Sequence, residues 1–481
     1  MNLDADYQKA LLIAGEWRTA QKGTVIDVVN PATSETVAEI GYGTDSEALD
    51  AVEAASGAFR KWRQTTPRQR ADLLLQAANL LLQRQEHIAF VLALESGKRL
   101  VEAVGEVRFA AEYFRWFAEE ARRPEGQWIP GDQPNKRHWT RTQPAGVALT
   151  LTPWNFPVSI QARKLAPSLA AGCTVVARAS QKAPLAVIEL FKCLEEAGFP
   201  PGVVNLIQGP ASTTTQAMMR HPAVRVVSFT GSTEVGQELI RESANGVQRL
   251  ALELGGNSPF IVFDDADIQT AVEGAMITKF RNNGQSCIAA NRFYVHQKVY
   301  DEFLEKFLQR VHVMRIADPA VDAASDLGPL IDHAAVEELR TLAKAAMDQG
   351  AVSLIKPLNV PGEGSYLSPI LLEGAPLDTG FACQELFGPV APVFKFSDEE
   401  EVLYAANNTD MGLASYVYTS NFGRATRVTE ALEYGIVGLN SALPSVAYAP
   451  MGGWKHSGLG REGARVGMEE FQEWKYVAAE L

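Results

Sequence analysis

Alternating strand-like and helix-like segments between residues 146 and 245 restrict the fold of this chain more than any other feature. Short apolar runs rich in valine and isoleucine are separated by longer segments whose apolar residues recur at helical spacing. The strand candidates span 147–151, 174–177, 203–207 and 226–229, and the helix candidates span 162–171, 184–196 and 213–219. Strands that alternate with helices form βαβ units, so the pattern predicts an α/β fold with a doubly wound parallel sheet.

The same alternation resumes after residue 259 and predicts a second sheet. Strand-like segments at 260–263 and 293–295 are followed by helix-like segments that begin near Ile268 and Lys298. A helical block precedes the first sheet and ends with a long helix at about 100–121. A chain of 481 residues is long enough for two or three domains, which fits two sheets.

Residues 123–144 interrupt this order with turn-forming Pro and Gly residues and a stretch that alternates polar and bulky side chains. We expect an exposed hairpin or arm here, whose free edge invites pairing with a partner chain. Residues 473–477 have the pattern of a final strand.

Composition excludes several classes of partner. The formal net charge is −13, and no sustained block of Lys or Arg is present, which argues against nucleic acid and against an anionic membrane surface. The four cysteines are far apart, and neither they nor the seven histidines have zinc-ligand spacing, so we expect no metal site. Few, distant cysteines and the lack of a long apolar segment predict a cytoplasmic protein.

Polar residues follow the first two predicted strands, at the ends where open α/β sheets bind ligands. Trp154 and Asn155 follow the strand at 147–151, while Arg178, Gln181 and Lys182 follow the next strand. These residues are therefore candidates for a ligand site.

The strand at 226–229 leads through a turn of small residues into a predicted helix that contains Gly231, Ser232 and Gly236. Free N–H groups at a helix N-terminus bind anions, although an ordinary capped helix has the same pattern. Residues 458–463 match G-x-G-x-x-G, but no apolar strand precedes them and only 18 residues follow, so we reject a dinucleotide-binding fingerprint there.

Cys287 lies in a loop that contains Asn282, Asn283, Gly284 and Gln285, a run typical of turns. The residue is a candidate nucleophile, although most free cysteines are small buried hydrophobes. Glu253 lies in an apolar run, where a carboxylate is costly unless it is paired or used. Burial would raise its pKa toward that of a general base, and a structural salt bridge is the alternative.

Six motifs occur in the order and at spacings similar to those of the aldehyde dehydrogenase superfamily, which the chain resembles over nearly its whole length. They span 153–157, 229–232, 252–256, 284–287, 385–389 and 450–455. The resemblance implies two doubly wound parallel-sheet domains and a small β oligomerisation arm. By the resemblance, 1–122 with 145–253 form the nucleotide-binding domain, 254–448 the catalytic domain, and 123–144 with 465–481 the arm.

The resemblance also assigns catalytic roles. Cys287 would attack the aldehyde carbon, and the Asn155 side chain with the Cys287 backbone N–H would stabilise the oxyanion. Glu253 would activate the water that releases the acid, so we favour hydrolysis over transfer to coenzyme A. The alternative is a non-catalytic member that binds nucleotide or serves structurally. The presence of Cys287, Glu253 and Asn155 argues against this alternative.

Cofactor contacts implied by the resemblance fall on Trp154, Arg178, Gly231, Ser232, Gly236, Glu385 and Phe387. Glu385 would hold the nicotinamide ribose, with Phe387 beside the ring. The acidic residue that usually repels a 2′-phosphate is replaced by the neutral Gln181, next to Lys182. We therefore expect NADP⁺ to be tolerated beside NAD⁺, with a preference for NADP⁺ left open.

The expected substrate is a small anionic aldehyde. The succinate-semialdehyde dehydrogenase branch of the superfamily resembles the chain at Arg163, Arg281 and Ser445, which we expect to bind a distal carboxylate. Each arginine has an ordinary salt bridge as its alternative role. Oxidation of succinate semialdehyde to succinate is the leading prediction. Glutarate semialdehyde, 2-oxoglutarate semialdehyde and a sulfonated aldehyde suit the same pocket, and a homodimer or homotetramer is expected.

Overall fold

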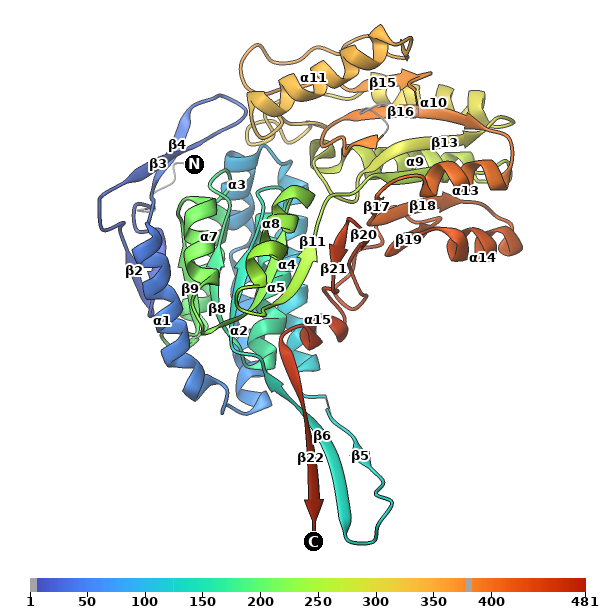
Figure 1. The fold of residues 1–481 in the computed structure, drawn as a ribbon. Helices are drawn as coiled ribbons and strands as arrows, with labels where there is room; N and C mark the ends of the chain where they lie inside the picture. The colour runs from blue at the N-terminus through green and yellow to red at the C-terminus, as the bar shows by residue number, and fades with distance from the viewer. Residues whose placement is uncertain (1–6, 124, 377–382) are drawn as a thin grey trace.

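Two helix-covered sheets and a projecting arm make up the fold, as the computed structural model of residues 7–123, 125–376 and 383–481 shows (Figure 1). The first sheet has the strand order β2-β1-β9-β8-β7-β10-β11-β21. Its strands are β1 (Leu11–Ile13), β2 (Glu16–Arg18), β7 (Val147–Leu151), β8 (Thr174–Arg178), β9 (Val204–Ile207), β10 (Val224–Thr230), β11 (Arg249–Glu253) and β21 (Gly458–Leu459).

The five strands from β7 to β11 are parallel, whereas β1, β2 and β21 are antiparallel additions at the edges. The predicted strands and helices of this region are confirmed to within a few residues, except that the helix after β7 starts five residues earlier than expected. The helices around this sheet are α1 (Asp45–Trp62), α2 (Pro67–Gln83), α3 (Gln85–Ser96), α4 (Leu100–Glu120), α5 (Pro157–Ala171), α6 (Leu185–Glu196), α7 (Ala211–Met219) and α8 (Thr233–Ser243).

The second sheet has the order β14-β15-β16-β13-β12-β18-β19, parallel except for the short β14 at its edge. Its strands are β12 (Ser258–Val262), β13 (Ala290–His296), β14 (Val352–Ser353), β15 (Ile370–Glu373), β16 (Val390–Phe396), β18 (Ala414–Tyr418) and β19 (Ile436–Leu439). Its helices are α9 (Ile268–Phe280), α10 (Tyr300–His312), α11 (His333–Asp348), α13 (Glu399–Asn407) and α14 (Phe422–Ala431). The α/β class with two doubly wound sheets is therefore confirmed.

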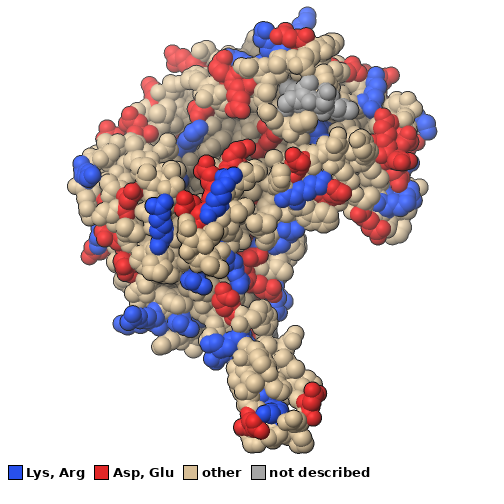
Figure 2. Space-filling view, in the orientation of Figure 1, with Lys and Arg blue, Asp and Glu red and all other residues tan. Residues whose placement is uncertain are grey.

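The arm is a three-stranded antiparallel sheet of β5 (Trp128–Ile129), β6 (Lys136–Pro144) and β22 (Gln472–Glu480). Segments from opposite ends of the chain pair here, from Gln472 beside Pro144 to Glu480 beside Lys136. The arm projects from the body and is mostly uncharged on the face shown in Figure 2.

The remaining short elements are β3 (Val25–Val29), β4 (Thr36–Gly41), β17 (Met411–Gly412), β20 (Trp454–Lys455), α15 (Val466–Glu469) and the 3-10 turn η1 (Arg281–Gly284). The tract at 458–463 contains β21 and opens no βαβ unit, which agrees with our rejection of a dinucleotide fingerprint. The proposed domain limits remain predictions, and β21 belongs to the first sheet although it follows the second in the chain. In the described ranges, every helix is too short or too polar to span a bilayer.

Candidate active site

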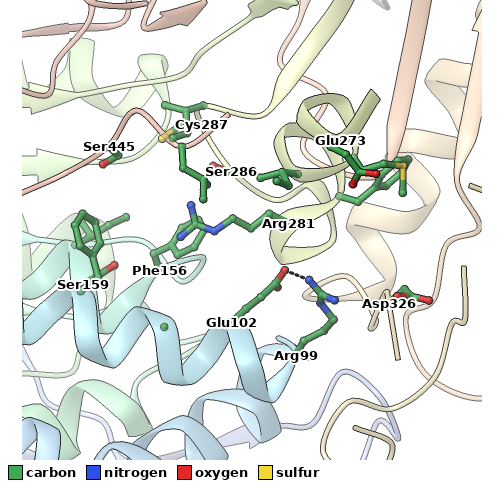
Figure 3. A pocket seen from close by; sticks show the side chains of 18 of the residues that line it. Arg99, Glu102, Phe156, Ser159, Glu273, Arg281, Ser286, Cys287, Asp326 and Ser445 are labelled. Atoms are coloured by element: carbon green, nitrogen blue, oxygen red, sulfur yellow. Dashed lines mark hydrogen bonds and ion pairs between the residues drawn. The ribbon is translucent and has the colours of Figure 1, made fainter. Parts of the chain in front are cut away.

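A cavity of about 580 Å³ is lined by the candidate nucleophile together with all three residues expected to bind the substrate anion. Cys287 and Ser445 lie at one end of the view in Figure 3, and Arg281 crosses the space between them and Glu102. Arg163 lines the same cavity from α5. The tertiary structure thus brings together residues that are up to 282 positions apart in the sequence (163 to 445).

The loop that presents Cys287 is made by three successive residues in the left-handed region. Asn282, Asn283 and Gly284 have φ values of 53°, 59° and 80°. Asn and Gly are the residues that adopt this conformation at least cost, which explains the Asn-Asn-Gly sequence. Across from the loop, a Cβ on Gly256 would lie 2.2 Å from the Cys287 carbonyl oxygen. Cys287 can occupy its place only because residue 256 has no side chain.

The Cys287 thiol is half-buried and faces the cavity. Burial above all, together with the carboxylates of Glu385 and Glu253, raises the pKa of Cys287 to about 12. The positive charge of Arg163 and the residue's own backbone N–H act in the opposite direction. The free protein therefore holds the thiol protonated at neutral pH, and a nucleophilic role requires that its proton be removed.

Asn155 is buried two residues before the start of α5, and its backbone carbonyl accepts two hydrogen bonds. Its side-chain nitrogen donates to the Gln285 carbonyl at 3.2 Å, which uses one of its two hydrogens. Its own carbonyl accepts from Lys98 Nζ at 2.7 Å and from Asn282 Nδ2 at 3.0 Å. The second amide hydrogen is available to a ligand.

Glu253 ends β11, and both its carboxylate oxygens are buried without a hydrogen-bond partner in the part of the chain described. Burial raises the pKa of Glu253 to about 8, and the nearby Glu462 raises it as well, against the lowering effect of Arg163 and Lys164. No salt bridge is found for Glu253 among the described residues, so the structural-pair alternative has no support. A buried, unpaired carboxyl with this pKa is suited to proton transfer.

Arg163 is not free. Its Nε lies 2.5 Å from Glu462 Oε2, and its Nη1 contacts the sulfur of Met451. Its Nη2 has no hydrogen-bond partner in the described ranges. The salt-bridge alternative for Arg163 is therefore partly correct, while one nitrogen remains for a ligand. Ser445 Oγ also contacts the Met451 sulfur, at 3.6 Å.

Arg281 forms no salt bridge with any described residue. Its guanidinium lies 5.1 Å from the centre of the Phe156 ring, an arrangement that holds the cation without neutralising it. Two acidic residues that line the same cavity (Figure 3) have other partners, because Glu102 pairs with Arg99 at 2.5 Å and Glu273 pairs with Arg310.

The expected cofactor residues lie where the two sheets meet. The rings of Trp154 and Phe387, from different sheets' loops, contact edge to face with centroids 5.5 Å apart. Glu385 is buried close by and accepts from the Gly256 N–H at 3.1 Å, and burial raises its pKa to about 7.

At the first sheet, Ser232 caps α8 by accepting from Val235 N at 3.4 Å. A Cβ on Gly236 would lie 2.5 Å from Leu254, and one on Gly231 would lie 2.3 Å from the Phe229 ring. Both glycines therefore allow the backbone at this helix N-terminus to pack closely. Glu385 lies against this helix start, because a Cβ on Gly255 would lie 3.3 Å from its carboxylate and 3.5 Å from the Thr233 hydroxyl. A buried carboxyl beside a helix N-terminus suits the ribose and phosphates of a dinucleotide.

Arg178 is the last residue of β8, one residue beyond the predicted strand, and Gln181 and Lys182 follow it. Arg178 is turned inward and donates to the Gly209 carbonyl at 3.1 Å, and burial lowers its pKa. Gln181 accepts from the Tyr42 hydroxyl at 2.9 Å. Lys182 pairs with Asp332 at 2.6 Å, and both side chains are largely solvated, so the pair is weak and exchangeable.

Sequence reasoning missed two buried ion pairs. Glu462 accepts from Lys164 as well as facing Arg163. Lys98 pairs with Glu106 behind Asn155. The available signal was a charged residue at a buried helical position, as with Glu106 between the apolar positions of α4.

Two doubly wound sheets, a loop-borne thiol that lines a cavity and an unpaired buried carboxyl are features of a dehydrogenase. The chain matches the aldehyde dehydrogenase family over residues 17–477 and belongs to that family.

The chain is similar throughout to several characterised members. It is 43% identical over 475 residues to succinate-semialdehyde dehydrogenase [NADP(+)] of Escherichia coli strain K12, covering 99% of this chain and 98% of that protein. It is 44% identical over 465 residues to 3-sulfolactaldehyde dehydrogenase of Pseudomonas putida, covering 97% of this chain and 96% of that protein. The crystal structure of succinate-semialdehyde dehydrogenase from Burkholderia pseudomallei is 40% identical, with a TM-score of 0.97 and complete coverage (100%) of both chains.

Proposed function

We propose that the protein oxidises a small anionic semialdehyde, with succinate semialdehyde converted to succinate as the leading assignment. The observation that carries this proposal is the unpaired Arg281 in the cavity that contains Cys287. An arginine without a carboxylate partner in a partly enclosed pocket favours an anionic ligand, and Arg163 Nη2 adds a second donor.

Cys287 is proposed as the nucleophile. Its thiol first loses its proton, for which the buried carboxyl of Glu253 is the candidate acceptor. The sulfur then forms a bond to the aldehyde carbon and the carbonyl oxygen becomes an oxyanion. The Asn155 amide, held by its anchored backbone, would donate its second hydrogen to that oxygen, together with the Cys287 backbone N–H.

A bound nicotinamide dinucleotide supplies the hydride acceptor for this chemistry. Trp154, Glu385 and Phe387 would hold its nicotinamide end, and Arg178, Gly231, Ser232 and Gly236 would hold the remainder. Gln181 places no negative charge where a 2′-phosphate would lie, and Lys182 can exchange Asp332 for it. We therefore propose that NADP⁺ is accepted as well as NAD⁺.

Glu253 is proposed as the base that activates water to hydrolyse the acyl group from Cys287. Its position in a buried, unpaired state supports this role, since a carboxylate already engaged in a salt bridge would be a poor base. Product release returns the free thiol and the acid.

The acid group of the substrate distinguishes the alternatives. A carboxylate and a sulfonate both suit an arginine pocket, and relatives of similar identity act on substrates of either kind by name. Glutarate semialdehyde and 2-oxoglutarate semialdehyde differ only in length or substitution. Succinate semialdehyde is preferred here because the chain shares Arg163, Arg281 and Ser445 with that branch.

A panel of these aldehydes with NAD⁺ and with NADP⁺ tests the proposal, with butanal as the uncharged control. We expect kcat/KM for succinate semialdehyde to exceed that for butanal by about 10- to 100-fold, the worth of one charged hydrogen-bonded pair. Absence of nicotinamide reduction with every aldehyde would contradict the enzymatic assignment. A preference for butanal would contradict the anionic pocket.

We also propose that the arm mediates self-association as a homodimer or homotetramer. Exposed aromatic residues on the arm support this, among them Trp128, Trp474 and Tyr476. The cytoplasmic location expected from cysteine usage remains a prediction.

A further inference from the structure

A buried ion pair lies directly behind Asn155. Lys98 is 0% exposed and Glu106 is 1% exposed, and the Lys98 ammonium contacts the Glu106 carboxylate. The removal of two charges from water is costly, and an apolar pair of similar volume often stabilises a protein as well or better. The role of this pair is therefore better judged from the contacts that it makes than from its contribution to folding stability.

Among the described residues, the hydrogen bonds that this pair makes beyond itself, and its contact with an aromatic ring, fall on residues 155–159. Lys98 Nζ donates to the Asn155 carbonyl at 2.7 Å and lies 4.1 Å from the centre of the Phe156 ring. The second Glu106 oxygen, Oε1, accepts from the backbone N–H groups of Val158 at 3.0 Å and Ser159 at 3.1 Å. Four residues of the segment that carries the proposed oxyanion donor are thus held by two side chains.

The turn between α3 and α4, which carries Lys98, also contacts the loop that presents Cys287. Asn283 Nδ2 donates to the carbonyl of Gly97, the residue before Lys98, at 3.2 Å. Asn282 Nδ2 donates at 3.0 Å to the Asn155 carbonyl that Lys98 also binds. One short turn between α3 and α4 therefore fixes the oxyanion segment of one sheet relative to the cysteine loop of the other.

We propose that Lys98, supported by Glu106, is a positioning residue that sets the Asn155 amide at the oxyanion. Lys98 is fully buried and its ammonium is bound to Glu106 and to the Asn155 carbonyl, so it acts through Asn155 and does not contact the substrate. This inference rests on the proposed function, in which Asn155 stabilises the oxyanion. A displacement of about 1 Å in such a donor costs on the order of 100-fold in rate.

A double-mutant cycle tests it. Lys98→Met should lower kcat by about 10- to 100-fold with the KM for NADP⁺ little changed, because only the donor geometry is altered. In an Asn155→Ala background, where no donor remains to be positioned, Lys98→Met should lower kcat less than about threefold. Equal losses in the two backgrounds would overturn the positioning role.

A purely structural role is separated by a second pair of variants. Lys98→Met alone leaves the Glu106 charge buried and unpaired, which lowers Tm, whereas Lys98→Met with Glu106→Gln removes both charges and should recover most of that Tm. The double variant should still show the kcat loss, because the bond to the Asn155 carbonyl is missing. Recovery of kcat together with Tm would overturn the proposal. The double variant also serves in the cycle if Lys98→Met alone is unfolded by circular dichroism.

Two controls distinguish a failure of the positioning role of Lys98 from a failure of the oxyanion role of Asn155. Lys306→Met, on the solvated face of α10 where the lysine pairs with Glu302, should leave kcat and Tm unchanged. If Asn155→Ala alone retains full kcat, the oxyanion role in the proposed function is wrong and the inference fails with it. If Asn155→Ala is impaired but the cycle is additive, only the positioning role of Lys98 is wrong.

Discussion

Arg163 Nε lies 2.5 Å from Glu462 Oε2, so one of the two arginines expected to bind the substrate is already paired with a carboxylate. Glu462 also pairs with Lys164, and the opposed charges keep the pKa of this buried carboxyl below its ordinary range despite its burial. Arg281 has no such partner among the described residues. The two arginines lining one cavity therefore differ in kind, and their substitution should have different consequences.

Arg163→Met should destabilise the protein, because Glu462 then keeps Lys164 as its only buried cationic partner. Because Lys164 still compensates Glu462, the loss should be below the value of about 3–5 kcal/mol for a buried charge left without any partner. Thermal unfolding and urea titration measure the loss. Arg163→Met with both Lys164→Met and Glu462→Gln removes all three charges and should recover part of it. An unchanged midpoint in the single variant would contradict the importance of the pair.

Arg281→Met should leave stability almost unchanged and remove the preference for anionic aldehydes. We expect kcat/KM for succinate semialdehyde to fall by about 10- to 100-fold, since a hydrogen bond to a charged group contributes roughly 1.5–3 kcal/mol. The value for butanal should change little. A parallel fall for both aldehydes would show that Arg281 does not recognise the anion.

Activity should rise with pH because Glu253 must be ionised to act as a base. Its pKa of about 8 predicts that the rate of acyl hydrolysis increases with pH, is half-maximal near pH 8 and levels off roughly one to two pH units higher. Stopped-flow measurement of hydrolysis after a single turnover isolates this step. Glu253→Gln should lower that rate by about 100-fold or more and remove the pH dependence. A flat profile in the native protein would contradict the assignment.

The same pKa predicts an opposite trend in stability. Because the pKa of Glu253 is raised on folding, the native state binds more protons than the unfolded state between the ordinary carboxyl pKa of 4.5 and about 8. The contribution of this group to stability is therefore lost as pH rises through that window. Relative to the native protein, Glu253→Gln should gain Tm progressively from pH 5 to pH 8. A difference in Tm independent of pH would show that the carboxyl titrates normally.

Gln181→Glu should weaken NADP⁺ selectively. A carboxylate at this position would repel a 2′-phosphate and hydrogen-bond a free ribose hydroxyl, so KM for NADP⁺ should rise about tenfold or more while KM for NAD⁺ falls or holds. Steady-state kinetics with both cofactors measure the ratio. Equal effects on the two would place residue 181 outside the ribose site.

Gly256→Ala should lower activity by displacing Cys287, although the cysteine itself is unchanged. The added methyl would lie 2.2 Å from the Cys287 carbonyl oxygen, so the nucleophile loop must move, and a shift of about 1 Å costs on the order of 100-fold in rate. Gly57→Ala in α1 is the matched control, because its methyl would meet no other residue within 4 Å. Full activity in Gly256→Ala would show that the loop tolerates displacement.

The sequence by itself determined the class of fold and the conformation of the loop that carries Cys287. The valine-rich runs and helical spacing between residues 146 and 245 gave strands and helices within a few residues of those observed, because burial on a parallel sheet demands those patterns. Asn282, Asn283 and Gly284 predicted the turn that displays Cys287, since backbone conformation is a local property.

Pairing between distant residues was decided by the tertiary structure alone. Arg163 is not free because it pairs with Glu462, which lies 299 positions further along the chain (462 − 163). In the sequence, Glu462 was visible only as part of a glycine-rich tract. The Lys98–Glu106 pair behind Asn155 and the place of β21 beside β11 are of the same kind. Local sequence encodes backbone conformation and burial, whereas the partner of a buried charge is fixed only when packing brings remote segments into contact.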